Sequence, residues 1–163
     1  MNIPIVNEKD EIIGYKERKD RTIEELVRAT GLWITDKDGN VLLAQRALNR
    51  RHAPGLWGPA AGGVVEERET YESCMIREAE EEIGLKGLTF KPGPKIRLDD
   101  CFSYFFSVIV DHDYKFKKQD EEVEQLKWFS VNELNELLKE KPEMFLNDFK
   151  KYMQLLKNHE NQS

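Results

Sequence analysis

Alternating apolar and polar positions predict strands in much of the chain, and a helical period replaces this alternation after residue 70. The helix is expected from Thr70 to Ile83, with Thr70 as the N-cap and Gly84 at the C′ position that favours glycine. Its expected core face comprises Met75, Ile76, Ala79 and Ile83. The segment Pro54–Gly63, rich in Gly, Pro and Ala, is predicted to be a loop that enters another strand. The other expected strands are Ile3–Val6, Glu11–Lys16, Glu24–Thr35, Val41–Arg46, Leu88–Lys91, Phe102–Val110 and Val123–Phe129.

Two helices are predicted near the C-terminus. Ser130 and Glu133 fit a capping box that opens a helix over Val131–Lys139. Pro142 then starts an amphipathic helix that extends to about Asn158. This last helix is expected to bury Phe145, Phe149, Tyr152 and Leu156. The order of strands, helix, strands and two helices is typical of an α+β fold, or of a layered α/β/α sandwich around a mixed sheet.

Composition narrows the class of protein. A length of 163 residues suits one domain, and 39% hydrophobic residues supply a core, which excludes general disorder. The 25 Lys and Arg against 31 Asp and Glu give a net charge of -6, which argues against binding a nucleic acid polymer or an anionic membrane through bulk electrostatics. A phosphate-bearing substrate stays compatible, because a metal ion can reverse the local charge. With two cysteines, no signal-peptide pattern and no apolar run of about 20 residues, we expect a cytoplasmic protein.

A cluster of acids in the first predicted helix carries the candidate chemistry. Glu78, Glu81 and Glu82 stand at i, i+3 and i+4, so their carboxylates project from one face. Clustered carboxylate oxygens are the ligands that Mg²⁺ and Mn²⁺ prefer. A Glu-rich helix is more often a solvated surface, so the spacing of the surrounding residues has to distinguish the two interpretations.

The acids belong to a longer pattern of fixed spacing. Gly63 is followed after five residues by Glu69, and after seven more by Arg77-Glu78-Ala79-Glu80-Glu81-Glu82-Ile83-Gly84-Leu85. This pattern, Gly63–Leu85, resembles the Nudix box of the Nudix hydrolases. The resemblance implies a Nudix-type α/β/α sandwich with a mixed central sheet, formed by residues 1–163 as a single Nudix hydrolase domain.

The resemblance also implies a reaction. Glu78, Glu81 and Glu82 would bind a divalent metal, Mg²⁺ or else Mn²⁺, and Glu82 or a carboxylate outside the box would assist the attacking water. Glu81 and Glu82 are therefore expected to be catalytic. The implied activity is hydrolysis of the pyrophosphate bond in a nucleoside diphosphate linked to a moiety X, or in a related organic pyrophosphate. The expected partner is thus a small-molecule diphosphate.

Other residues would support this reaction. The resemblance implies that Glu69 and Arg77 act in catalysis as a charge-assisted pair that orients the metal-binding edge. At Gly63 the missing Cβ would let the backbone approach the metal or the substrate phosphate. A basic loop before the box could bind a substrate phosphate, although a basic surface loop is an equally good interpretation. Its basic residues are Arg46, Arg50, Arg51 and His52.

An acidic turn precedes the last expected strand. Asp120, Glu121 and Glu122 lie where several Nudix enzymes carry a further catalytic carboxylate. A solvated turn is the favoured interpretation. A mutation at Glu121 or at Glu122 would test the interpretation that this turn carries a catalytic carboxylate.

The flanks resemble one branch of the family, the isopentenyl-diphosphate isomerase-like branch. The similar segments are Asn7–Gly14, Val41–Arg46 and Pro54–Trp57. True isomerases carry a Cys where this chain has Gly62, and His where it has Val64 and Val27. Because these residues are absent, isomerase activity is disfavoured and stays the runner-up function. A non-catalytic nucleotide-binding Nudix module is a further alternative, which the complete acid set disfavours. Dimers are common in the family, so a homodimer is compatible with the resemblance, but the sequence itself does not define the oligomeric state.

Overall fold

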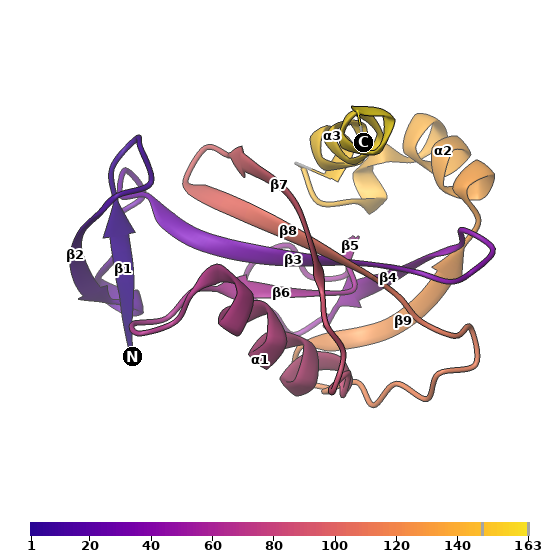
Figure 1. Ribbon diagram of the computed structural model, residues 1–163, viewed down its shortest axis with the longest axis horizontal. Coiled ribbons are helices and arrows are strands. Elements are labelled where there is room, and N and C mark those ends of the chain that lie inside the picture. The colour runs from indigo at the N-terminus through magenta and orange to yellow at the C-terminus, as the bar shows by residue number, and fades with distance from the viewer. Residues whose placement is uncertain (148, 163) are drawn as a thin grey trace.

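The computed structural model describes residues 1–147 and 149–162, and the side chains of these residues except 150, 156, 157 and 159–162. The burial predicted for Leu156 therefore falls outside the described side chains. Figure 1 shows three layers, in which a sheet lies between one helix on one face and two helices on the other. The predicted α+β sandwich is confirmed. Across the described residues, no helix is both long and apolar enough to span a membrane.

The central sheet is mixed because its middle pair of strands is parallel. Its seven strands, as far as the structure describes the chain, are β3 (Val27–Thr35), β4 (Val41–Arg46), β5 (Trp57–Pro59), β6 (Ala61–Val64), β7 (Lys91–Arg97), β8 (Cys101–Ile109) and β9 (Val123–Phe129). Across the sheet the order is β5-β4-β3-β8-β7, while β6 also pairs with β3 and β9 with β4. β3 and β8 run parallel, and the other pairs are antiparallel.

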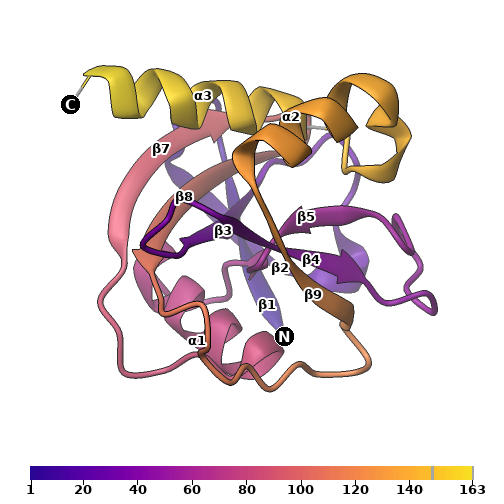
Figure 2. The same cartoon turned by 90° about the vertical axis from the view of Figure 1, so that its right-hand side faces the viewer.

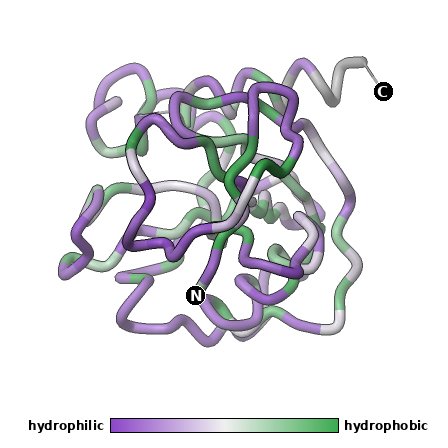
Figure 3. Tube along the Cα trace, turned by 90° about the vertical axis from the view of Figure 1, so that its left-hand side faces the viewer, coloured by the Kyte–Doolittle hydropathy of each residue, from purple (hydrophilic) through white to green (hydrophobic). Residues whose placement is uncertain are grey.

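Helices cover both faces of this sheet (Figures 1 and 2). They are α1 (Tyr71–Ile83) on one face, and α2 (Val131–Glu140), the 3₁₀ helix η2 (Pro142–Met144) and α3 (Phe149–Gln162) on the other. Successive residues of a strand point to opposite faces, so Leu32 and Ile34 of β3 pack under α1 while Trp33 packs under α2 and α3. The hydropathy colouring of Figure 3 places apolar segments inside the trace and polar segments on the outer turns.

A separate antiparallel hairpin packs at one end of the sheet (Figure 1). It comprises β1 (Asn2–Val6) and β2 (Ile12–Glu17), and the 3₁₀ helix η1 (Arg18–Asp20) follows it. Asp10 lies in the turn of this hairpin, with a φ of 60° and a side chain that is only 6% exposed. This carboxylate accepts hydrogen bonds from Arg28 Nε of β3 and Lys95 Nζ of β7, both at 2.8 Å. The Tyr71 hydroxyl of α1 donates a third at 2.9 Å, so the turn is tied to three elements of the main fold.

The predicted core face of α1 is wrong at one position. Ile76 is 46% exposed, whereas Cys74 is fully buried together with Met75, Ala79 and Ile83. At about 100° per residue, the buried arc is centred closer to Cys74 than predicted, and Ile76 lies beyond its edge. The shift has a consequence for the site, because Glu78 now falls within the buried arc rather than beside it.

The last predicted helix begins too early. Pro142 opens only the short η2, and α3 starts at Phe149. Between them Phe145 is extended, with φ -114° and ψ 154°, and bridges Trp57 of β5. The Leu146 amide donates to the Trp57 carbonyl at 3.0 Å. This long-range pairing fixes an extended segment where the local period favours a helix. Burial of Phe145, Phe149 and Tyr152 is confirmed.

Two strand predictions also need correction. The strand expected at Leu88–Lys91 lies instead at Lys91–Arg97, despite Pro92 and Pro94. β7 is the last strand in the sheet order and has an irregular register between Pro92 and Lys95, a setting in which proline is tolerated. The predicted loop Pro54–Gly63 contains the short strand β5 and most of β6.

Candidate active site

Helix α1, which carries the predicted acids, begins and ends where the sequence indicates. Thr70 Oγ1 accepts a hydrogen bond from the Ser73 amide at 3.0 Å, and Ser73 Oγ accepts one from the Thr70 amide at 2.9 Å. This reciprocal cap satisfies two backbone donors at the N-terminus. At the other end Gly84 has a φ of 68°, the left-handed conformation that favours glycine.

A long connection closes the C-terminal end of α1. The β8–β9 loop (residues 110–122) runs past this end of the helix (Figure 2). The Lys117 amide donates to the Ile83 carbonyl at 2.9 Å, and the Gln119 amide donates to the Glu82 carbonyl at 2.8 Å. Carbonyls that have no partner within the helix are thus satisfied by the loop. The acidic turn at the end of this loop is thereby held next to Glu82.

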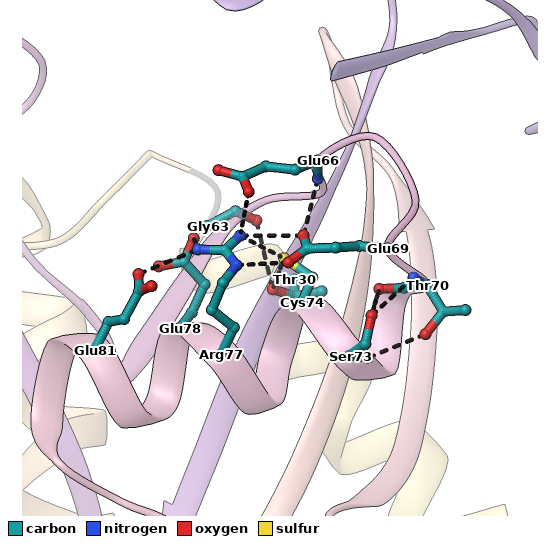
Figure 4. A network of polar contacts seen from close by, with 10 residues as sticks. All are labelled: Thr30, Gly63, Glu66, Glu69, Thr70, Ser73, Cys74, Arg77, Glu78 and Glu81. Atoms are coloured by element: carbon teal, nitrogen blue, oxygen red, sulfur yellow. Dashed lines mark hydrogen bonds and ion pairs between the residues drawn. The ribbon is translucent and has the colours of Figure 1, made fainter. Parts of the chain in front are cut away.

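Glu69 and Arg77 form the predicted pair between loop and helix. Arg77 Nε donates to Glu69 Oε1 at 2.5 Å and Arg77 Nη2 donates to Glu69 Oε2 at 3.1 Å, a bidentate contact (Figure 4). Burial alone would raise the pKa of Glu69, but the hydrogen bonds from Arg77 and from the Glu66 amide hold it below its usual range. The same contact raises the pKa of Arg77. Both groups therefore stay charged, which strengthens the hydrogen bonds between them.

The other edge of the Arg77 guanidinium faces the acid cluster. Arg77 Nη1 donates to Glu78 Oε1 at 3.0 Å and to Glu81 Oε2 at 3.2 Å (Figure 4). The two acids differ in exposure, since the Glu78 side chain is 15% exposed and that of Glu81 is 56% exposed. Arg77 thus links the Glu69 anchor to two of the three predicted metal ligands.

Gly63 lies against Glu78. In β6, Gly63 pairs with Thr30 of β3, and β6 lies against α1. A Cβ on Gly63 would overlap the Glu78 carboxylate and lie 3.0 Å from Glu78 Cγ. Only glycine lets the carboxylate come this close to the strand.

Glu82, like Glu78, is partly buried, whereas Glu81 is exposed. The Gly62 amide donates to Glu82 Oε1 at 3.5 Å. Burial raises the pKa of Glu82 to about 8, and a hydrogen bond with Glu78 together with its negative charge acts in the same direction. Two carboxylates that share a buried site cannot both ionise freely, so this pair retains a proton near neutral pH.

The donor set of these acids suits a hard divalent cation. All of the groups are carboxylates, and the Glu78–Glu82 pair has an unfavourable concentration of negative charge that a cation would relieve. In the described part of the chain, no three Asp, Glu, His or Cys side chains already converge as a metal-binding group. Arg77 instead supplies positive charge to Glu78 and Glu81. The residues present therefore fit a divalent metal ion at this edge of α1.

The basic β4–β5 loop (residues 47–56) and the end of β4 contribute arginines near Glu82. Burial and the positive charges of Arg50 and Arg18 lower the pKa of Arg46, whereas Glu82 raises it. Arg46 Nε donates to the His52 carbonyl at 3.0 Å. Arg51, the second predicted substrate-binding residue, lies exposed in the loop. The structure thus brings Arg46 into electrostatic contact with the acids and places Arg50 there as well.

Sequence reasoning missed two contributions to this site. One is the Gly62 amide, which faces Glu82. The other is an ion pair between Arg50 and Glu122, which joins the β4–β5 loop to the β8–β9 loop. The sequence marks these two regions by the pair Gly62-Gly63 and by the basic residues Arg50, Arg51 and His52. It does not identify which glycine amide faces Glu82 or which basic residue pairs with Glu122. Trp57, by contrast, is buried edge-on against Phe129 with ring centroids 5.3 Å apart and belongs to the core.

Comparison with known proteins places the chain in a family. The NUDIX domain family model matches residues 25–149. The Nudix hydrolase YfcD of Escherichia coli K12 is 31% identical over 137 residues, which are 81% of this chain and 75% of YfcD. DR0079 from Deinococcus radiodurans matches with a TM-score of 0.84 over 96% of this chain and 99% of its own, at 20% identity.

A further solved structure shares the fold. It is a bifunctional NMN adenylyltransferase/ADP ribose pyrophosphatase from Francisella tularensis, complexed with AMP and a manganese ion. It matches 86% of this chain and 43% of its own, with a TM-score of 0.67 and 18% identity. At such identities the two solved structures establish the fold alone.

The chain belongs to the Nudix family, as the match over residues 25–149 and the identity to YfcD establish. It is an enzyme of the Nudix pyrophosphohydrolase class. The resemblance found in the box is thereby confirmed. Membership of the isomerase-like branch stays a prediction.

Proposed function

We propose that this enzyme is a divalent-metal-dependent hydrolase, using Mg²⁺ or Mn²⁺, that cleaves the pyrophosphate bond of a nucleoside diphosphate linked to a moiety X or of a related organic pyrophosphate. The observation that carries the proposal is the position of the Glu78 and Glu82 carboxylates against the Gly62–Gly63 backbone. A polyanionic substrate can approach such an acidic pair only when a cation balances the charge.

In this proposal Glu78, Glu81 and Glu82 hold the metal. When bound, the metal neutralises the diphosphate and makes a water molecule more acidic. Glu82 is partly buried and its pKa is raised, so its deprotonated carboxylate is a stronger base than an exposed one and can take up the proton released by the attacking water. A carboxylate outside the box is the alternative proton acceptor.

The remaining residues of the site position these acids. Glu69 fixes Arg77 through two hydrogen bonds, and Arg77 fixes Glu78 in turn. A bidentate, charge-assisted contact restrains rotation as well as distance, which is what a metal ligand requires of its supporting residues. The negative charge of Glu82 raises the pKa of Arg46, and we propose that Arg46 faces the substrate phosphates. Arg51 is exposed and has weaker support for this role.

The proposed substrate class draws on the fold neighbour from Francisella tularensis. That protein is an ADP ribose pyrophosphatase and was solved with AMP. A nucleotide moiety is therefore a reasonable first choice for the substrate of this chain, while X has to be found by experiment.

The test is product formation from a substrate panel. The purified protein is incubated with Mg²⁺, with Mn²⁺ and with EDTA in the presence of nucleotide sugars, dinucleoside polyphosphates, ADP-ribose, oxidised dNTPs and isoprenoid diphosphates. We expect metal-dependent release of a nucleoside monophosphate and a phosphorylated X from at least one nucleotide. Binding without turnover across the panel would indicate a nucleotide-binding module instead. Conversion of isopentenyl to dimethylallyl diphosphate would indicate an isomerase.

A further inference from the structure

An ion pair joins the two loops that flank the candidate active site. Arg50 Nη1 of the β4–β5 loop contacts Glu122 Oε2 at the end of the β8–β9 loop, and these side chains are 25% and 39% exposed. Their backbones are also connected, since the Ala47 amide donates to the Glu122 carbonyl at 3.0 Å. The Arg50 amide donates to the Ala47 carbonyl at 3.2 Å. The pair therefore forms between segments that are already fixed to each other.

The same ion pair lies beside the end of α1 that carries Glu82. The Glu122 amide donates to the Gln119 carbonyl at 3.1 Å, and the Gln119 amide donates to the Glu82 carbonyl at 2.8 Å. Two hydrogen-bond steps thus connect Glu122 to the helix.

The contact uses only part of the Arg50 guanidinium. A guanidinium has five N–H donors in a planar fork. Among the described residues, Glu122 is the ion-pair partner of Arg50, and it engages Nη1. The Nε and Nη2 groups form the other edge, and such an edge matches two oxygens of a phosphate.

We propose that Arg50 binds the diphosphate of the substrate and that Glu122 is the positioning residue that holds Arg50 for this contact. The inference rests on the proposed function and adds Arg50 to Arg46 as a residue that contacts the substrate phosphates. An arginine side chain that is already restrained loses less rotamer entropy when it binds an anion, so the charge of Glu122 improves binding although it repels phosphate itself. The side chain of the neighbouring Arg51 is exposed and has no ion pair with the described residues that would restrain it, so Arg51 is the weaker candidate.

Variants of both residues test the proposal. The probe for binding is methylenediphosphonate with Mg²⁺, titrated calorimetrically, and KM and kcat are measured with a substrate from the panel. Arg50→Ala should raise Kd and KM by about 10- to 100-fold, as loss of a charge-assisted bidentate contact does. Glu122→Gln should raise both by about 3- to 10-fold and leave kcat within about twofold. Glu122→Asp, which keeps the charge, should fall between wild type and Glu122→Gln.

A double variant separates positioning from other roles. Because Glu122 is proposed to act through Arg50, Glu122→Gln should have no further effect on Kd in the Arg50→Ala background. Glu121→Gln removes a charge from the exposed neighbour and is the matched control, expected to bind like wild type. Thermal unfolding of each variant checks that the fold is kept.

Several results would overturn the proposal. One is an unchanged Kd and KM in Glu122→Gln, and another is an effect of Glu122→Gln on Kd that persists in the Arg50→Ala background. A third is a Kd for Glu121→Gln that rises as much as that of Glu122→Gln. A large loss of kcat at unchanged KM in Glu122→Gln would place Glu122 in the chemical step instead. The titration needs no turnover. If the wild type hydrolyses nothing in the panel, the proposed function fails, and the titration still decides the roles of Arg50 and Glu122.

Discussion

Replacement of Gly63 by alanine perturbs the closest approach between the sheet and the acid cluster. The new Cβ would overlap the Glu78 carboxylate and lie 3.0 Å from Glu78 Cγ. Non-bonded carbon atoms prefer separations of about 3.5–4.0 Å, so the Glu78 side chain would have to move by roughly 1 Å. A displacement of this size at a catalytic centre costs on the order of 100-fold in kcat/KM. This corresponds to about 2.7 kcal/mol of transition-state stabilisation.

The fold itself should tolerate this substitution. The overlapping atoms belong to the far end of a flexible side chain, and the expected loss in free energy of unfolding is below about 1 kcal/mol. Gly62→Ala is the informative contrast, because its Cβ would lie 2.5 Å from the Thr30 carbonyl oxygen, which is backbone. We expect that variant to lose about 1–3 kcal/mol of stability. Gly14→Ala has no atom within 4 Å of its Cβ and should change neither property.

The assay combines initial rates at saturating Mg²⁺ with chemical unfolding of all three glycine variants. The prediction is a Gly63→Ala enzyme that is about 100-fold less active but stable, and a destabilised Gly62→Ala protein. It would be refuted by a Gly63→Ala enzyme that keeps kcat/KM within about threefold of wild type. A Gly63→Ala protein destabilised as much as Gly62→Ala would also contradict it.

Two further predictions concern charge. Asp10→Ala should lower the free energy of unfolding by about 3 kcal/mol, because it leaves Arg28 and Lys95 without their buried partner. Urea unfolding measures this change, and a loss below about 1 kcal/mol would disprove the prediction. Glu82 has a pKa of about 8 in the fold against an ordinary 4.5, so the folded state binds more protons between these values and metal-free stability should fall as pH rises through them. Mg²⁺ binds the deprotonated form of Glu82, so it should raise Tm more near pH 8.5 than near pH 5.5. Glu82→Gln should abolish this difference. Equal gains in Tm at the two pH values in the wild type would contradict the prediction.

Local signals account for the parts of the fold that could be predicted. The limits of α1 follow from a capping residue, Thr70, and from Gly84, which can adopt a positive φ. The start of α3 could not be predicted this way, because Phe145 is held extended by its bridge to Trp57, far away in the sequence. β7 was missed for a related reason, since its place at the end of the sheet order allows prolines that the local pattern disfavours.

The candidate site divides along the same line. The resemblance to the Nudix box predicts the contact between Glu69 and Arg77, which the structure contains. Helical spacing also groups the three acids, but it cannot tell that Glu82 is partly buried and Glu81 exposed, because that depends on which strand packs against the helix. The inward position of Arg50 likewise depends on the β8–β9 loop.

The measurement that tests the central claim most directly is metal-dependent hydrolysis by Glu81→Gln and Glu82→Gln beside the wild type. The substrate is the one that the panel identifies, and thermal unfolding confirms that both variants fold. We predict Mg²⁺-dependent release of a nucleoside monophosphate by the wild type and its loss by at least about 100-fold in both variants. Retention of most turnover in both would contradict the assignment of these carboxylates to the reaction.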